Sequence, residues 1–190
     1  VRGFKMSTVI KNGHVVDPKN KVDSVMDVLI SKGKIEKVGK GLTGDKEIDA
    51  KGKIVVPGLI DMHVHLREPG REDKETIETC SRAAARGGFT SIVGMPNTTP
   101  VADDQTVIKY ITSIAEKEAI VNVYPTGNIT KGGKGKGLSQ IGDLKRAGAI
   151  AVSDDGWDVK DTGLMRMAMD YLKKWKLPII SHSEDIDLSG

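Results

Sequence analysis

The chain of 190 residues carries a formal net charge of +3 at pH 7, from 29 Lys and Arg against 26 Asp and Glu, and this small, dispersed excess argues against a nucleic-acid partner. Its hydrophobic fraction of 38% and charged fraction of 29% are those of a soluble globular protein, and its apolar runs fall far short of the ~20 residues that a membrane-spanning helix needs. The single cysteine, Cys80, has no internal disulfide partner, so we expect a cytoplasmic protein without a membrane segment.

The N-terminal region predicts a small β-domain. Residues 1–5 precede Met6, a suitable initiator, and we expect them to be a tag or an alternative start. Within residues 6–56, hairpin signals at Asn12-Gly13 and Lys32-Gly33 punctuate apolar segments, which predict strands at 8–16, 26–30 and 34–38. His14 lies in the first of these without an accompanying ligand, so we expect it to face solvent.

From Pro57 onward, strand-like and helix-like segments alternate, which is typical of a parallel sheet with crossover helices. We expect strands at 58–65, 89–95, 120–124, 149–153 and 178–182, and helices at 74–86, 106–119, 138–147 and 164–176. Polar residues gather after the carboxyl ends of the strands, which favours a barrel over a doubly wound sheet. Residues 57–190 are therefore predicted to form the first portion of an α/β TIM (β/α)8 barrel, about five βα units long.

The length of this region is too small for a whole barrel. From Lys53 to Gly190 there are 138 residues (190 − 53 + 1), whereas an eight-stranded barrel takes roughly 250. An open five-stranded wall would leave an unpaired edge and an uncovered core. We expect either a fragment of a longer product, which we favour, or completion of the barrel by another polypeptide.

His63 and His65 are the first candidate metal ligands. The chain has four histidines, and two of them fall within these three positions. Residues two apart on a strand face the same side, so both imidazoles can reach one ion while Met62 and Val64 pack the other way. The plain alternative is a pair of surface or core histidines, but the scarcity of histidine favours a metal site.

The later strands end in further candidate ligands. Asn97 follows the second, Asp154-Asp155-Gly156 follows the fourth, and His182 ends the fifth. Alone, the aspartates would suit an ordinary turn, and His182 would suit a hydrogen-bonded core position. Their placement after successive strands favours one shared site, and histidines with an aspartate are a ligand set for Zn²⁺.

The segment Val56-Pro-Gly-Leu-Ile-Asp-Met-His-Val-His-Leu-Arg-Glu-Pro-Gly70 resembles the first barrel strand of the amidohydrolase superfamily, and within it the bacterial type I dihydroorotases. The resemblance runs from about Thr8 to the last residue. It implies an amidohydrolase-type barrel after a small β-sandwich domain that strands from the far C-terminus complete. It assigns the metal to His63, His65, Asp155 and His182, with Asp154 the weaker choice, and the substrate to His65, Arg67 and Asn97.

The activity that the resemblance implies is the zinc-dependent interconversion of dihydroorotate and N-carbamoyl-L-aspartate in pyrimidine synthesis, with one or two Zn²⁺ ions per site. Arg67 would clamp the substrate carboxylate in two-pronged fashion. The family's remaining histidine ligand and catalytic aspartate are expected beyond Gly190, so the 190 residues alone are expected to be inactive. A homodimer and an association with aspartate transcarbamoylase are the partners to consider besides the small-molecule substrate.

Two rivals stay open at this point. Hydantoinases and allantoinases typically bridge their metals with a carboxylated lysine at the end of strand four, where this chain has no lysine between Ala149 and Asp155. A non-catalytic dihydroorotase-like subunit that only scaffolds aspartate transcarbamoylase is the other. The intact His63 and His65 argue against it.

Overall fold

The computed structural model describes residues 6–184 and residue 188. The tag or alternative start expected at residues 1–5 lies outside them. The chain divides into two compact units, Val1–Pro57 and Gly58–Gly190. Within the described residues, no helix is both long enough and apolar enough to cross a membrane.

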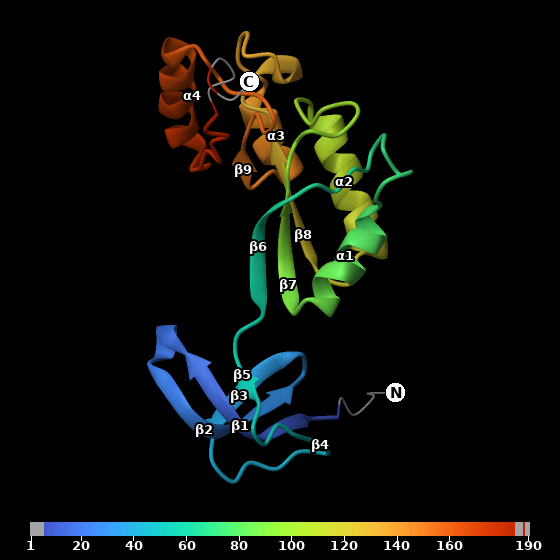
Figure 1. Ribbon diagram of the computed structural model, residues 1–190, viewed down its shortest axis with the longest axis vertical. Coiled ribbons are helices and arrows are strands. Elements are labelled where there is room, and N and C mark those ends of the chain that lie inside the picture. Colours follow the sequence, from blue (N-terminus) through green and yellow to red (C-terminus); the bar gives the residue numbers. More distant parts are fainter. Residues whose placement is uncertain (1–5, 185–187, 189–190) are drawn as a thin grey trace. The chain divides into compact units, whose positions relative to one another are not determined.

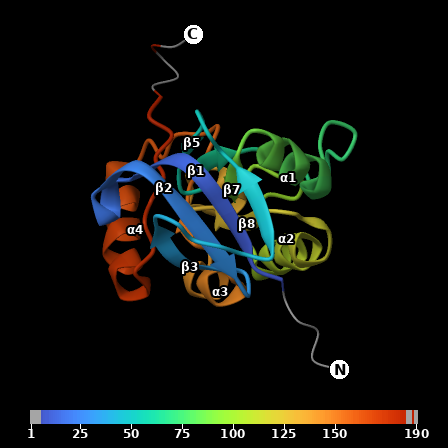
Figure 2. The same ribbon diagram turned by 90° about the horizontal axis from the view of Figure 1, so that it is seen from below.

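A sheet of five strands makes up the described part of the first unit, in the order β3-β2-β1-β4, with β5 also pairing with β1 (Figure 2). The strands β1, β2 and β3 are antiparallel neighbours, whereas β4 and β5 run parallel to β1. Val9, Val15 and Val28 are buried here. The elements are β1 (Thr8–Asp17), the 3-10 helix η1 (Pro18–Asn20), β2 (Val22–Ser31), β3 (Lys34–Gly39), β4 (Lys46–Asp49) and β5 (Ile54–Val55). The two short strands β4 and β5 were not predicted, because segments of four and two residues are too short to show an alternating pattern.

Asn12 and Gly13 lie inside β1 and form an irregularity there, so the hairpin predicted at this point is wrong. The register of β1 with β2 shifts just before Gly13. Asn12 adopts a left-handed φ of 60°, and its backbone N–H donates to Oδ1 of Asp27 at 2.9 Å. A left-handed Asn followed by Gly suits a bulge as well as a tight turn, and only the partner strand distinguishes them. The hairpin at Lys32-Gly33 is confirmed between β2 and β3.

The described part of the second unit contains a parallel sheet of four strands in the order β6-β7-β8-β9 (Figure 1). Strands that are consecutive in the sequence are neighbours in space, with helices between them, as in the wall of a (β/α)8 barrel. The elements are β6 (Leu59–Val64), α1 (Ile77–Arg86), β7 (Phe89–Gly94), α2 (Gln105–Glu118), β8 (Asn122–Gly127), η2 (Lys131–Gly133), α3 (Ile141–Ala147), β9 (Ala151–Val152) and α4 (Thr162–Trp175).

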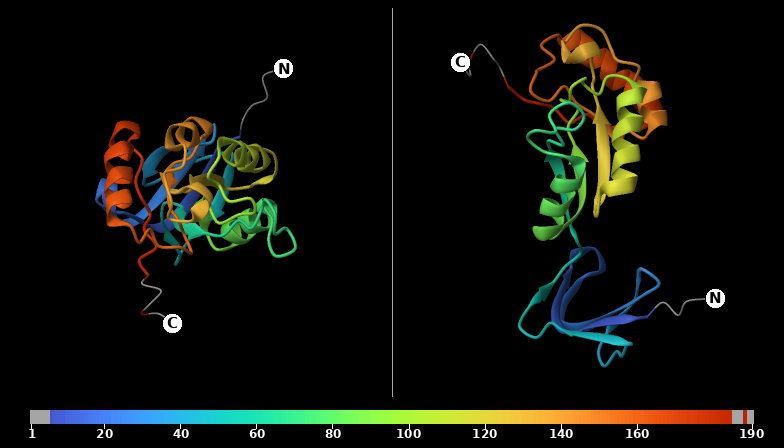
Figure 3. Two further views of the ribbon diagram at one scale, coloured as in Figure 1. Left: turned by 90° about the horizontal axis from the view of Figure 1, so that it is seen from above. Right: turned by 90° about the vertical axis from the view of Figure 1, so that its right-hand side faces the viewer.

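Two buried apolar clusters join the helices to this sheet. In the first, α1 packs on β7 and α2 on β8, so that these helices cover one face of the strands (Figure 3). Its buried members are Leu66, Ile77, Ile92, Ala102, Val107, Ile108, Ile111, Leu144 and Ala149. The second cluster joins α3, α4 and β9 through Ile129, Ile141, Val152, Val159, Ala168, Leu172 and Leu177. Burial of these side chains holds the strand ends, and therefore the residues that follow them, in place.

Among the element boundaries that differ from the prediction, those of α1 and β8 have identifiable causes. The first helix begins at Ile77, three residues later than expected, because Thr76 caps it and exchanges hydrogen bonds with Thr79. The third strand continues beyond the predicted end at residue 124, through Pro125 to Gly127. Proline lacks an N–H, but the Pro125 carbonyl still accepts from Ile150 N–H at 3.1 Å, so the strand passes through it.

The strand predicted at residues 178–182 exists only as a single parallel bridge between Val152 and Ile179. The Val152 N–H donates to the Pro178 carbonyl at 3.1 Å, and the Ile180 N–H donates to the Val152 carbonyl at 2.9 Å. The neighbouring strand β9 has only two residues, so it offers little edge for a longer ladder. This bridge nevertheless carries the chain to His182 at the carboxyl end of the sheet.

Candidate metal centre

His63 and His65 lie at the carboxyl end of β6, with His65 just beyond its last residue. Their rings are 5.3 Å apart between centroids, at an interplanar angle of 81°. Val64 between them packs against the apolar cluster of α1 and α2. Met62, predicted to pack in the same way, is 70% exposed, so that part of the prediction is wrong for the described residues. The alternation of the strand is enough to turn both imidazoles toward one point.

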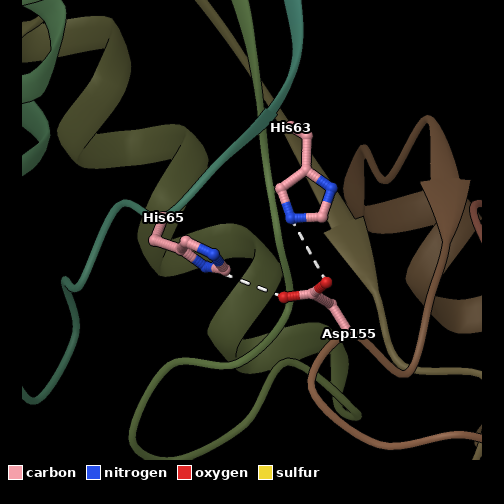
Figure 4. Close-up of side chains that lie close together, drawn as sticks. All are labelled: His63, His65 and Asp155. Carbon is pink, nitrogen blue, oxygen red and sulfur yellow. Dashed lines mark ion pairs between the residues drawn. The ribbon is translucent and has the colours of Figure 1, made fainter. Parts of the chain in front are cut away.

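The carboxylate of Asp155 occupies that point. Its side chain is only 5% exposed, and its two oxygens face different histidines (Figure 4). His63 Nε2 lies 3.2 Å from Oδ1, and His65 Nδ1 lies 3.7 Å from Oδ2. Ligand atoms of these three residues all fall within 4.8 Å of one another. The loop after β9 thus brings a buried carboxylate group to the end of β6.

His182 reaches the same carboxylate from the segment after the single bridge. Its Nδ1 is 3.3 Å from Asp155 Oδ1, and its Nε2 is 2.8 Å from Glu184 Oε2. Hydrogen bonding to Glu184 and then to Asp155 raises the pKa of His182, against the opposing effect of burial. His182 therefore contacts the centre through Asp155, while the mutually close set consists of His63, His65 and Asp155.

Asp154, the neighbour of Asp155, has a different environment. It is 3% exposed and accepts hydrogen bonds from Asn128 Nδ2 at 3.2 Å, from Ile129 N–H at 2.8 Å and from Thr130 N–H at 3.1 Å. The Thr130 hydroxyl also donates to it. These bonds tie the loop after β8 to the end of β9. Asp154 is fully engaged in this connection, and Asp155 is the aspartate that faces the histidines.

Asn97, which follows β7, links two of the candidate ligands. Its Oδ1 lies 3.0 Å from His65 Nδ1, and its Nδ2 donates to Asp155 Oδ2 at 3.1 Å. With Nδ1 as the donor, the lone pair of His65 remains on Nε2, which is the form that can bind a metal. Sequence reasoning predicted Asn97 only as a substrate contact. The missed connection to His65 and Asp155 depends on tertiary packing and leaves no sequence signal.

Arg67 follows His65 by two residues and adopts a left-handed φ of 60°. Its side chain is half-buried, and within residues 6–184 it has no ion-pair partner. A guanidinium without a carboxylate partner beside a candidate metal centre is able to bind an anion. The role of Arg67 in binding the substrate carboxylate stays a prediction.

The donor set fits a divalent metal such as zinc, which binds imidazole nitrogen and carboxylate oxygen. In a tetrahedron with arms of ~2.0–2.1 Å, neighbouring ligand atoms are about 3.3 Å apart. The separations of 3.2 Å from His63 and 3.3 Å from His182 to Asp155 Oδ1 match this edge. The contacts of His63 and His182 with this buried carboxylate therefore have the spacing expected of neighbouring metal ligands.

Solved structures with a similar fold are described as hydantoinases, dihydropyrimidinases and a dihydroorotase. An L-hydantoinase (dihydropyrimidinase) from Arthrobacter aurescens superposes with a TM-score of 0.81 at 22% identity, covering 95% of this chain and 41% of the other. A structure described as a dihydroorotase superposes with a TM-score of 0.60 at 16% identity, over 94% of this chain and 51% of the other. These likenesses concern the fold. They define its class as the amidohydrolase-type TIM barrel, in agreement with the predicted fold class.

The sequence comparisons narrow the class to one family. The family described as dihydro-orotase-like matches residues 52–189. A dihydroorotase of Citrifermentans bemidjiense is 54% identical and one of Geobacter sulfurreducens is 53% identical, each over 188 residues, and one of Acetivibrio thermocellus is 53% identical over 184. The chain belongs to the dihydroorotase-like family. It spans 43–44% of the length of these relatives.

Proposed function

We propose that the protein is a dihydroorotase, a zinc-dependent hydrolase that interconverts dihydroorotate and N-carbamoyl-L-aspartate in pyrimidine synthesis. The observation that carries this proposal is the Asp155 carboxylate facing His63, His65 and His182 in a chain that is about half identical to named dihydroorotases. The parts of the site that the family adds to these groups, a further histidine and a catalytic aspartate, would come from the length of the relatives that this chain does not span.

In the proposed mechanism, His63, His65, Asp155 and His182 hold the metal. A Zn²⁺ ion held by these residues would supply Lewis-acid chemistry, namely polarisation of a carbonyl and a lowered pKa of bound water. Each Asp155 oxygen faces a different histidine, so this carboxylate would hold the metal together with both of them. Its burial keeps water from competing for the carboxylate.

Substrate orientation falls to Arg67 and Asn97, with His65 beside them. Dihydroorotate carries one carboxylate, and a guanidinium offers two parallel N–H donors for it. Asn97 lies against both His65 and Asp155, so a carboxylate held there would place the ring next to the metal ligands. Holding the ring in this way lowers the entropic part of the barrier.

The end of strand four supports the dihydroorotase over the hydantoinase-type alternative. Asp155 stands where those enzymes would use a carboxylated lysine, and residues 149–155 contain no lysine. A lysine of that kind needs carbon dioxide to form, whereas an aspartate is already ionised at neutral pH. We expect metal reconstitution of the apo-protein to be indifferent to bicarbonate. If metal reconstitution required bicarbonate, the assignment of Asp155 as the bridging ligand would be wrong.

The decisive test is an assay of the protein expressed from its complete open reading frame and loaded with zinc. We expect turnover of dihydroorotate and little or none of hydantoin or allantoin. Preference for either of the latter would reassign the enzyme to the rival class. Full zinc loading without turnover of any of these cyclic amides would instead support the non-catalytic scaffold.

Location and partners are parts of the same proposal. We propose a cytoplasmic enzyme that acts on a small molecule, as a homodimer or in association with aspartate transcarbamoylase. Supporting this location, Cys80 is half-buried and has no cysteine partner. Analytical ultracentrifugation of the complete protein, with and without added aspartate transcarbamoylase, would decide among monomer, homodimer and mixed assembly.

A further inference from the structure

Glu68 is a buried carboxylate that the proposed mechanism does not use. It is 8% exposed and has no ion-pair partner within residues 6–184. Its Oε2 accepts from the backbone N–H of Ile77, the first residue of α1, at 2.8 Å. Its Oε1 accepts from the hydroxyl of Tyr110 on α2 at 3.1 Å. The two oxygens therefore join the loop after β6 to two different helices, and a helix N-terminus favours such a negative charge.

These hydrogen bonds hold Glu68, the residue that follows Arg67, in place. Arg67 lies between the fully buried Leu66 and the buried Glu68, and its carbonyl accepts from the Arg71 N–H at 2.8 Å. Its left-handed φ of 60° is uncommon for a residue with a Cβ and persists where the surroundings impose it. The contacts on both sides of Arg67 thus fix the backbone from which its side chain extends.

The loop after β6, which contains Arg67 and Glu68, packs against the loop that carries Asn97. The Thr99 N–H donates to the Pro69 carbonyl at 2.9 Å. Gly70 packs so closely that a Cβ there would lie 2.0 Å from the Thr99 carbonyl oxygen. Asn97 in turn contacts His65 and Asp155. Glu68 thereby anchors a pair of loops that together bear both predicted contacts to the substrate carboxylate.

We propose that Glu68 and Tyr110 are a positioning pair that fixes Arg67 for recognition of the substrate carboxylate. The inference rests on the proposed function. Tyr110 acts from α2 through Glu68 and does not touch the reacting atoms. Burial, then hydrogen bonding and charge repulsion from Glu68, raise the pKa of the Tyr110 hydroxyl, so it remains a donor across the neutral range.

The test is Tyr110→Phe in the zinc-loaded protein from the complete open reading frame. This change removes one hydroxyl and keeps the ring. We expect the KM for dihydroorotate to rise about threefold to tenfold, the range that one lost hydrogen bond gives, with kcat and zinc content unchanged. Tyr171→Phe is the matched control, because Tyr171 is also a helical tyrosine, 44% exposed against 39% for Tyr110. Its KM should not change.

A second pair of variants shows whether the effect passes through Arg67. In an Arg67→Lys background, Tyr110→Phe should add less than about twofold to KM, because residues that act through one another are not additive. Glu68→Gln retains a group that can accept from Ile77 and donate to Tyr110, so its KM should stay closer to the parent's than that of Tyr110→Phe.

The outcomes separate this inference from the function on which it rests. An active parent in which Tyr110→Phe lowers only the melting temperature, or raises KM equally with Arg67 and with Lys at position 67, would overturn the positioning role alone. A zinc-loaded parent that does not turn over dihydroorotate would overturn the proposed function first, and the positioning role with it.

Discussion

The Nε2 atom of His63 lies 3.2 Å from Oδ1 of Asp155, although His63 is the last residue but one of β6 and Asp155 follows β9, the fourth strand of the same sheet. In a parallel sheet the carboxyl ends of all strands meet at one edge, and this contact is a direct consequence. The spacing is the one expected of neighbouring ligands of one cation. Three of the predictions below rest on this arrangement and on the contacts around it, and the fourth concerns the buried Asp27 of the first unit.

His63→Ala and His65→Ala should each lose most of the bound zinc and lower kcat/KM more than about 100-fold, since even the partners of metal ligands contribute 10–100-fold. Zinc is measured by atomic absorption in the complete protein. His14→Ala is the control, because His14 is an exposed residue of β1 whose neighbour is Asp23. Full zinc and normal turnover in both variants would remove these histidines from the site.

Asp155→Ala and Asp154→Ala should fail in different ways. Loss of Asp155 removes the carboxylate that faces the histidines, so metal affinity and activity should fall while the fold persists. Loss of Asp154 leaves buried donors of Asn128, Ile129 and Thr130 unpaired and should cost at least about 2 kcal/mol of unfolding free energy. At a temperature where Asp154→Ala is folded, it should still bind zinc. Loss of zinc in Asp154→Ala together with retained zinc in Asp155→Ala would instead make Asp154 the metal ligand.

Arg67→Lys should reduce kcat/KM for dihydroorotate about 10- to 100-fold with zinc retained, because an ammonium cannot make the two parallel contacts of a guanidinium. Arg71→Lys is a suitable control, since Arg71 is exposed and pairs with Asp73. Steady-state kinetics and zinc content are the measurements. Unchanged kinetics would assign Arg67 a structural role.

Asp27 should stabilise the first unit in a pH-dependent way. It is buried and accepts from the N–H groups of Asn12 at 2.9 Å and Leu42 at 3.0 Å, and these bonds lower its pKa below the ordinary 3.8. The stabilisation is fully present above pH 3.8 and is lost as the pH falls through the lower pKa of the folded state.

Asp27→Asn should therefore lower the protection of the β1 and β2 amides in hydrogen exchange at pH 7 by about 1–3 kcal/mol, and the difference from the parent should shrink below pH 3.8. Asp23→Asn on the same strand is the control, because the Asp23 side chain is 76% exposed. An equal effect of Asp27→Asn at pH 7 and at pH 3 would contradict the assignment.

Local pattern was sufficient to predict most of the second unit. The alternation of strand and helix, the stops at Gly87-Gly88 and the apolar spacing of the helices depend on neighbours within a few residues, and the predicted helices appear within three residues of their expected bounds. Boundaries at α1 and β8 moved because one cap and one proline carbonyl had partners that the pattern does not reveal. The dipeptide Asn12-Gly13 suits either a hairpin turn or a bulge, and only the pairing of β1 with β2 decides that it forms a bulge.

In the candidate site, too, some features were predictable from the sequence and others depend on tertiary packing. His63 and His65 were predictable because strand periodicity alone turns both toward one side, and the resemblance to a known family supplied Asp155 and His182. Which aspartate faces the histidines in space, the link from Asn97 to His65 and Asp155, and the anchoring of Glu68 by Tyr110 all join residues from different strands and helices. Such contacts arise only when the elements pack, because their energy comes from groups that are far apart along the chain.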